Sequence, residues 1–428
     1  MRTESDEVRA QEATHRSPGS LTVVVSGEGR HLFDAIKDPR VRVVPAGSTP
    51  PDLVVFPCSR FRRFGNVDPA ALPDSLRTRI AAGHVGVVFD SSLEGVAHKP
   101  DITAALHAAI GQLGAAPHQC VYVTQDRQYE ADYRAHCAAV HLQPVSVLVH
   151  DYWIWDALSQ YESTGDEVFE QRLATFRARQ PHRQRMFVSL NRTPRPAKIL
   201  FLLRLLRDGL WEKGFISFGG FRRTITGRGK DRPSSTRLEP SLPGFEDLVV
   251  QLAPFIGQLD AYGRVMLGLE RHGWTNIDLT SGTRAVELDE YDESWFTIVT
   301  ETEMRPRPSR ITEKALKALV NFHPLLVLGN PYALEMIRSY GFATFEDVFD
   351  ESYDVELNPR RRFEQVYDQF RRACERPDED WARVEHRIRE KLIANARWGL
   401  TKFPSAYRRK QDPIVVNRLL EATGRDER

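Results

Sequence analysis

Two short segments of the chain combine side chains suited to a phosphorylated ligand. The first spans residues 189–195 and contains Asn191, Arg192 and Arg195. It lies between a strand-length apolar run and a helical pattern, and ligands of open α/β sheets bind at the carboxyl ends of strands. Guanidinium groups grip phosphate with two hydrogen bonds, and the N-terminus of the following helix adds partial positive charge. The segment therefore predicts a phosphate-binding site, with an arginine-rich surface turn as the alternative.

The second segment places Glu301 at the end of a strand-length run and Thr312, Glu313 and Lys314 at the start of the next helical pattern. Thr312 can cap that helix, which leaves Glu313 and Lys314 in its first turn, facing the sheet edge. A carboxylate there can accept hydrogen bonds from ribose hydroxyls, and an ammonium can neutralise a diphosphate. In the alternative interpretation, Glu313 only complements the helix dipole and Lys314 is solvated.

Other patterns that suggest chemistry are better explained as ordinary structure. Gly27-Glu28-Gly29 follows the first strand, but Leu32 stands where a dinucleotide fingerprint needs its third glycine. Residues 227–230 lack P-loop spacing, and the acidic residues of 289–293 are typical of a solvated loop. The histidines show no zinc-binding spacing, and the four cysteines form no CxxC pair. We therefore expect no bound metal, no cofactor and no disulfide framework.

Charge and hydropathy limit the class of protein further. Lys plus Arg number 59 against 58 for Asp plus Glu, so no overall basic field favours non-specific nucleic-acid binding. No apolar run reaches the roughly 18 residues that a membrane helix needs. Residues 1–20 are polar and charged, without the apolar core of a signal peptide, which predicts a disordered arm and a cytoplasmic location.

The elements that must position these side chains alternate between strands and helices. In the first half, five apolar, β-branched runs predict strands over residues 21–25, 52–56, 85–89, 120–124 and 145–149. A helix is predicted over 100–113 because its apolar residues recur near the helical period. This alternation implies a mainly parallel sheet covered on both faces.

The same pattern returns after the polar, charge-rich stretch 159–185. Strands are predicted over 186–190, 215–218, 295–300 and 324–328, and helices over 197–208, 245–259, 312–322 and 332–340. Residues 221–244 have almost no apolar periodicity, which predicts a long loop able to order over a polyanionic ligand. Residues 359–428 are charged and helical.

A chain of 428 residues is too long for one core. The sequence predicts an α/β fold with a disordered arm (1–20), an N-terminal Rossmann-like domain (21–160), a C-terminal Rossmann-like domain (186–358) and a helical extension (359–428).

The segments 296–302, 311–314 and 324–329 together resemble the donor-binding motif of the α-1,3-fucosyltransferases. In that family a Phe-rich strand ends in Glu-Asn, a Tyr/Ile-Thr-Glu-Lys helix start follows, and a Pro-Val-Val-x-Gly strand comes next. This chain differs at Thr302, where the family usually has Asn, and in a longer intervening loop. The resemblance implies a GT-B glycosyltransferase with two Rossmann-like domains facing a cleft and no essential metal. The N-terminal domain (21–160) would then bind the acceptor, and the C-terminal domain (186–358) the nucleotide sugar. The resemblance also implies that Glu301, Glu313 and Lys314 hold the nucleotide-sugar donor, without fixing the sugar or the base.

Sugar transfer to a hydroxyl needs a base that deprotonates the acceptor and cations that stabilise the departing diphosphate. A single base is sufficient for a reaction that inverts the anomeric configuration. We expect that base in the N-terminal domain, at Asp90 or Glu94, with Asp126 and Asp151 as further candidates. Alternatively, each of these carboxylates has only a structural role, in a turn or at a helix cap.

The expected partners are a nucleotide-sugar donor and a hydroxyl acceptor, which is a glycan, a small molecule or a modified base. No integral membrane contact is expected. Two alternatives remain open. One is a non-catalytic protein that binds a nucleotide or polyanion. The other is a DNA-modifying glycosyltransferase that uses the basic residues of 222–232 and Arg360-Arg361-Arg362.

Overall fold

The computed structural model describes most of the chain and divides it into two compact units. The described residues are 20–26, 31–45, 50–58, 64, 67–93, 95, 97–159, 161–191, 194–218, 243–268, 289–307 and 310–424. Unit 1 comprises residues 1–152 and 406–428, and unit 2 comprises residues 153–405.

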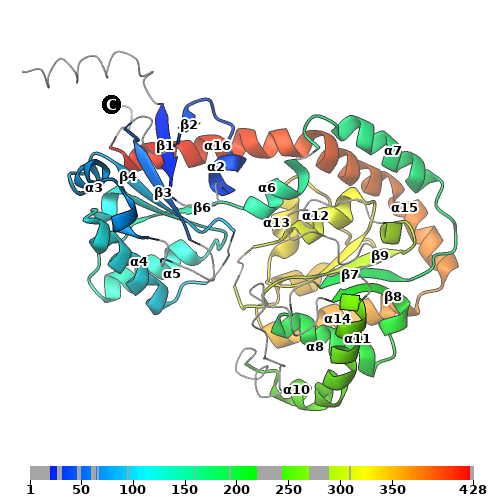
Figure 1. Ribbon diagram of the computed structural model, residues 1–428. Coiled ribbons are helices and arrows are strands. Elements are labelled where there is room, and N and C mark those ends of the chain that lie inside the picture. Colours follow the sequence, from blue (N-terminus) through cyan, green and yellow to red (C-terminus); the bar gives the residue numbers. More distant parts are fainter. Residues whose placement is uncertain are drawn as a thin grey trace, which may run out of the picture. The chain divides into compact units, whose positions relative to one another are not determined.

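Unit 1 contains a six-stranded parallel sheet (Figure 1). Its strands are β1 (Leu21–Val25), β2 (Val41–Val43), β3 (Leu53–Pro57), β4 (Gly86–Asp90), β5 (Cys120–Thr124) and β6 (Ser146–Val149). They lie in the order β2-β1-β3-β4-β5-β6, so the direction of winding reverses between β1 and β3. This is the topology of a doubly wound, Rossmann-like sheet.

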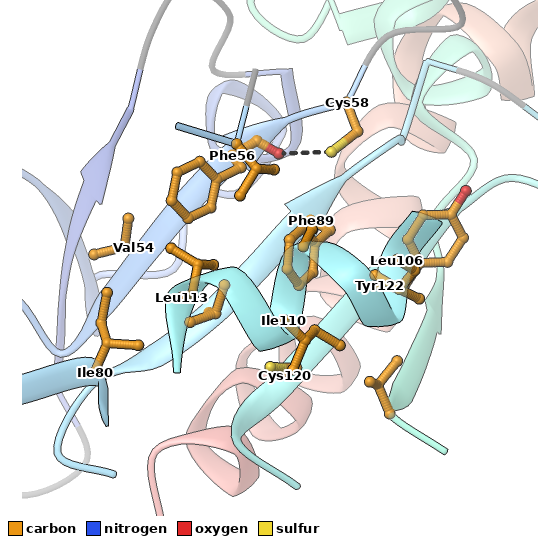
Figure 2. Packing of buried hydrophobic residues seen from close by; sticks show 14 of the residues in the cluster. Val54, Phe56, Cys58, Ile80, Phe89, Leu106, Ile110, Leu113, Cys120 and Tyr122 are labelled. Carbon is orange, nitrogen blue, oxygen red and sulfur yellow. Dashed lines mark hydrogen bonds between the residues drawn. The ribbon is translucent and has the colours of Figure 1, made fainter. Parts of the chain in front are cut away.

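Helices cover both faces of this sheet. The described helices near it are α2 (His31–Ala35), α3 (Asp74–Ala81), α4 (Pro100–Leu113) and α5 (Tyr129–Ala139). One face buries Val54, Phe56 and Phe89 against apolar residues of α3, α4 and α5, such as Ile80 and Leu106 (Figure 2). Valines, with leucines and phenylalanines, make most of these strands apolar on both sides, as a covered parallel sheet requires.

The other face of the sheet packs against the last helix of the chain, α16 (Phe403–Ala422). Val415, Val416 and Leu419 of α16 share a buried cluster with Val23 and Val55 of the central strands. The final helix therefore supplies part of the core of unit 1.

Unit 2 contains a four-stranded parallel sheet (Figure 1). Its strands are β7 (Phe187–Asn191), β8 (Gly214–Phe218), β9 (Phe296–Thr300) and β10 (Leu325–Leu328), in the order β10-β9-β7-β8. The chain adds β8 on one side of β7 and β9 on the other. The winding therefore reverses between β7 and β9, and such a switch point is where open α/β sheets bind ligands.

The described helices of unit 2 surround this sheet. They are α6 (Tyr152–Ser159, with Tyr152 assigned to unit 1), α7 (Gly165–Arg177), α8 (Pro196–Arg207), α10 (Glu246–Leu252), α11 (Ile256–Gly268), α12 (Glu313–Val320), α13 (Ala333–Ser339), α14 (Pro359–Glu375) and α15 (Asp378–Arg397). α8 lies against α10 and α11, α12 against α15, and α14 against β10. A π-helical turn, Trp398–Lys402, joins α15 to α16.

The two parallel sheets with their helices confirm the predicted α/β class, and the nine predicted strands are present within one residue of their expected bounds. Strand β2 was not predicted, because it has only three residues and Arg42 interrupts its apolar pattern. The helix expected over 245–259 is wrong as a single element, since a tight turn at Ala253–Phe255 containing Pro254 separates α10 from α11. The four cysteines are buried free thiols. Among the described helices, none combines the length and hydropathy needed to cross a bilayer.

Candidate functional site

The candidate site lies at the switch point of the four-stranded sheet, where β7 ends at Asn191 and β9 ends at Thr300. These strands pair at Phe187–Phe296 and Val188–Thr297. At their carboxyl ends a side-chain bond links them, because Thr300 Oγ1 donates to Asn191 Oδ1. Asn191 is fully buried, and its Nδ2 donates to Ser189 Oγ at 2.8 Å. The structure therefore gives Asn191 a positioning role at the sheet edge.

Glu301 follows β9 and carries the most unusual hydrogen-bonding state of the site. Only 2% of its surface is exposed, and its Oε1 accepts a hydrogen bond from the backbone N–H of Thr312 at 2.9 Å. Its Oε2 is also buried but has no hydrogen-bond partner among the described residues. A buried oxygen without a donor is costly, so the carboxylate is poised to accept hydrogen bonds from a ligand.

Glycine is needed beside this carboxylate. A Cβ on Gly329, just after β10, would lie 2.8 Å from Cβ and 2.9 Å from Cγ of Glu301. Arg362 of α14 fixes the same loop, because its Nε donates to Gly329 O at 2.8 Å and its Nη2 to Arg305 O at 2.6 Å. The loops after β9 and β10 are thus tied together by one buried guanidinium.

The start of α12 brings Thr312, Glu313 and Lys314 to the same edge. Thr312 occupies the N-cap position, but its side chain makes no cap hydrogen bond, so the predicted cap is wrong. Its hydroxyl instead accepts from Lys314 Nζ at 2.9 Å, because that ammonium lies within reach and is the stronger donor. Lys314 Nζ also lies 3.7 Å from Glu313 Oε1.

Glu313 is held in its charged form. Burial raises the pKa of this carboxyl, but the nearby ammonium groups of Lys314, Lys317 and Lys198 outweigh burial, and its pKa is lowered overall. Glu313 is therefore ionised at neutral pH and can only accept hydrogen bonds.

Lys198, in the first turn of α8, is a site residue that the sequence did not reveal. Only 3% of its surface is exposed, and in the part of the chain that the structure describes its ammonium makes neither a hydrogen bond nor an ion pair. Burial and the neighbouring cations Lys314 and Arg195 lower its pKa well below 10.5, against the opposing effect of Glu301 and Glu313. Buried lysines are rare unless paired, so this one is suited to an incoming anion.

One of the two predicted arginines, Arg195, lies near this lysine. Arg195 occupies the N-cap position of α8 and is close enough to influence the pKa of Lys198. Arg192 lies outside the described residues. The structure therefore brings Arg195, Lys198, Glu301, Glu313 and Lys314 into one electrostatic cluster, with Thr312 and Asn191 as its supports.

The candidate bases belong to unit 1. Asp90 ends β4, and its two oxygens accept hydrogen bonds from the backbone N–H groups of Leu32 (3.2 Å) and Ser92 (2.9 Å). Asp151 forms an ion pair with Arg127 at 2.6 Å, and Asp126 accepts from the backbone N–H of Gln128 at 3.0 Å.

Glu94 lies outside the described residues, as does nearly all of the loop 221–244. A base role for Asp90 or Glu94 and a lid role for the loop stay predictions.

Across the described ranges, no three His, Cys, Asp or Glu side chains gather into a group that could hold a metal ion. The cations of the cluster belong to the protein itself, and they can neutralise a diphosphate directly. Whether the reaction needs a metal stays a prediction.

Comparison with known proteins gives little beyond this geometry. No family model matches the chain, and no curated protein matches it in sequence. One solved structure that matches is an MnaA–UDP co-structure from S. aureus, at 10% identity and a TM-score of 0.33, covering 94% of this chain and 96% of that chain. Another is an α,α-trehalose-phosphate synthase (UDP-forming) from Burkholderia vietnamiensis, at 12% identity and a TM-score of 0.39, covering 94% of this chain and 99% of that chain. Both TM-scores are below 0.5, so neither likeness bears on what this chain binds.

Proposed function

We propose that the chain is a GT-B glycosyltransferase that moves a sugar from a nucleotide-sugar donor to a hydroxyl acceptor. The donor binds at the carboxyl edge of the four-stranded sheet in unit 2, and unit 1 binds the acceptor. Transfer proceeds with inversion and without an essential metal. The single observation that carries this proposal is the charge arrangement at the switch point, where Oε2 of Glu301 is buried without a hydrogen-bond partner among the described residues beside the buried side chain of Lys198.

The two kinds of charge match the two polar parts of a nucleoside diphosphate. Lys198, Lys314 and Arg195 supply positive charge for the diphosphate, and the N-terminus of α8 adds to it. Glu301 and Glu313 are acceptors for the hydroxyl groups of the ribose. A simple inorganic anion would leave the carboxylates without donors, so the arrangement favours a ligand with both groups.

The same cations serve the chemical step. When the bond between the anomeric carbon and the diphosphate breaks, negative charge grows on the leaving oxygen. Ammonium groups fixed beside that oxygen stabilise the transition state more than the ground state, which is what accelerates a reaction.

The structure gives little support to a nucleic-acid acceptor bound by Arg360-Arg361-Arg362. Arg360 forms ion pairs with Asp247 (3.2 Å) and Glu364 (3.0 Å), and Arg362 is buried against backbone carbonyls. These two arginines are therefore already engaged within the protein.

A thermal-shift panel of nucleoside diphosphates and nucleotide sugars, run with and without EDTA, tests the proposal. At least one base should raise the melting temperature, and the shift should persist in EDTA because protein cations hold the diphosphate. Release of nucleoside diphosphate from the stabilising nucleotide sugar then separates an enzyme from a binding protein. No stabilisation by any nucleotide would refute the proposal, and stabilisation that EDTA abolishes would refute its metal-independent form.

A further inference from the structure

A buried guanidinium lies beside the candidate site and bonds to the loops that form it. Arg362 of α14 is 1% exposed, and its guanidinium donates to three backbone carbonyls, those of Gly329 (2.8 Å), Arg305 (2.6 Å) and Glu356. Burial lowers the pKa of Arg362 to about 10, although Asp354 and Glu356 oppose this effect. The arginine is therefore charged at neutral pH, and burying it costs free energy that its hydrogen bonds must offset.

The three carbonyls belong to three different segments of unit 2. Arg305 lies in the loop after β9, Gly329 directly follows β10, and Glu356 lies just before α14. A guanidinium directs its N–H groups along fixed directions in one plane, which suits it to acceptors that stand apart from one another. A lysine carries all its donors on one nitrogen and cannot reproduce this arrangement. Arg362 therefore fixes the three segments at one point.

The segment from Glu301 to Arg305 is held against the loop after β10 at both of its ends. At the first end, Glu301 N donates to Leu328 O at 2.8 Å. At the second end, Arg305 N donates to Asn330 Oδ1 at 2.8 Å, and Arg305 O accepts from Nη2 of Arg362. Both backbone polar groups of Arg305 are thus held by buried side chains, since Asn330 is 3% exposed. The position of this segment depends on Arg362 as well as on the strand pairing.

These tethers restrict the side chain of Glu301. Its Cβ and Cγ lie so close to Gly329 that a Cβ on the glycine would stand 2.8 Å and 2.9 Å from them. Its Oε1 accepts from the backbone N–H of Thr312, and its Oε2 is the buried oxygen without a partner among the described residues. Because Arg362 bonds to the carbonyl of Gly329, it holds the backbone against which Glu301 packs.

We propose that Arg362 is a positioning residue of the donor site, which holds Glu301 so that its Oε2 can accept a hydrogen bond from a hydroxyl group of the ligand. The ligand part of this inference rests on the proposed function, in which the carboxylates of the site accept from the ribose. Arg362 is buried and acts through Gly329 and Arg305, and a carboxylate that is already held in place loses less entropy on binding. In the alternative, Arg362 only docks α14 on the sheet, and its replacement lowers stability without changing ligand recognition.

Three variants of the full-length protein separate these roles. Arg362→Lys keeps the charge but not the three directed hydrogen bonds, and Asn330→Ala removes the other tether of Arg305 without changing any charge. The matched control is Arg179→Lys. Arg179 is also a buried arginine of unit 2 that bonds to a backbone carbonyl, but its Nη2 donates to Asn321 O at 2.9 Å, at the C-terminal end of α12.

The first measurement needs no ligand. Hydrogen exchange of the Thr312 amide reports whether Oε1 of Glu301 still accepts from it, and NMR with selective isotope labelling of threonine can follow this amide. It should exchange at least about tenfold faster in Arg362→Lys and Asn330→Ala than in the wild type, because the segment that carries Glu301 opens more often. In Arg179→Lys the rate should be that of the wild type.

The second measurement is calorimetry with ADP, CDP, GDP and UDP, and with the dideoxyribose analogue of the nucleotide that binds most tightly. The wild type should prefer the ribonucleotide, because only this ligand offers ribose hydroxyl groups to Glu301. In Arg362→Lys and Asn330→Ala the affinity for the ribonucleotide should fall about tenfold or more, and the affinity for the analogue should stay the same. Arg179→Lys should leave both affinities unchanged.

Each other result is decisive. If the Thr312 amide exchanges at the wild-type rate in Arg362→Lys, Arg362 does not position Glu301 and the inference is overturned. It is overturned equally if the wild type does not distinguish the two ligands, or if the variants bind both ligands with equal losses or with none. If no nucleoside diphosphate binds the wild type while Thr312 exchange depends on Arg362, the positioning role stands and the glycosyltransferase proposal fails.

Discussion

Replacing Lys198 by methionine should make unit 2 more stable and the donor site weaker. Methionine fills a similar volume without a charge, and the ammonium of Lys198 is buried without a partner among the described residues. The burial of this charge therefore gives the wild type an electrostatic cost that the variant lacks. Such a cost is typical of residues kept for function.

The electrostatic cost of burying Lys198 should decrease as the pH rises. Burial and nearby cations lower the pKa of Lys198 in the folded protein, whereas in the unfolded chain it is about 10.4. Between these two values the unfolded chain holds one more proton, so the free energy of unfolding rises with pH by up to about 1.4 kcal/mol per unit. Below the folded pKa the cost is fully present, and above pH 10.4 it vanishes.

Urea unfolding followed by tryptophan fluorescence can measure this effect in unit 2 alone. All seven tryptophans lie between residues 153 and 405, so the signal does not report on unit 1. We expect Lys198→Met to exceed the wild type in stability at pH 7, and the difference to shrink as the pH approaches 10.4. Lys410→Met, at an exposed position of unit 1, serves as the matched control and should leave the transition unchanged.

Nucleotide binding should change in the opposite direction. A charge-assisted hydrogen bond from Lys198 to a diphosphate is worth roughly 1.5–3 kcal/mol, so calorimetry should show affinity falling about 10- to 150-fold in Lys198→Met. A variant that is less stable than the wild type at pH 7, or that keeps full nucleotide affinity, would show that Lys198 is an ordinary core residue.

Three further predictions concern unit 2. Lys314→Ala and Glu313→Ala should each weaken nucleoside diphosphate binding in calorimetry, by about 10- to 150-fold for Lys314, and should change the free energy of unfolding by only about 0.3–1 kcal/mol. If both variants bind nucleoside diphosphate as tightly as the wild type, this helix start is purely structural. Gly329→Ala should weaken nucleotide binding and cost about 1–3 kcal/mol, because its Cβ would displace Glu301, and an unaltered affinity would contradict that contact. Arg179→Met should lower the free energy of unfolding of unit 2 by about 3 kcal/mol in urea, since this buried guanidinium pairs with the carboxylate of Asp292 at 2.7 Å. A decrease of less than about 1 kcal/mol would show that this ion pair does not stabilise unit 2.

The sequence predicted the elements well because parallel strands buried on both faces leave an unmistakable pattern. The runs at 120–124 and 296–300 are apolar and β-branched, and both became central strands. The sequence also placed the residues after 190 and after 300 at strand ends of one predicted sheet, but not at its switch point. Strand order itself was not predictable, because it depends on packing between distant segments.

The site was predicted only in part, for a physical reason that Lys198 makes clear. A lysine in a helix is usually solvated, and its type and spacing do not reveal that Ala197, Ile199 and Leu200 around it are all buried. Thr312 illustrates the opposite error. Threonine is a common N-cap residue, but here its hydroxyl accepts a hydrogen bond from the ammonium of Lys314 and does not cap the helix.

The packing of α16 has a consequence for the order in which the chain can fold during translation. Strands β1 to β6 are made first, but Val415, Val416 and Leu419, which cover Val23 and Val55, are made last. Unit 2 is complete in sequence once residue 405 has left the ribosome, whereas unit 1 still presents the part of its apolar face that α16 covers. Domains usually mature in the order of synthesis. Here the first-made sheet must wait for the end of the chain, and during that interval its uncovered face is a natural binding surface for a chaperone.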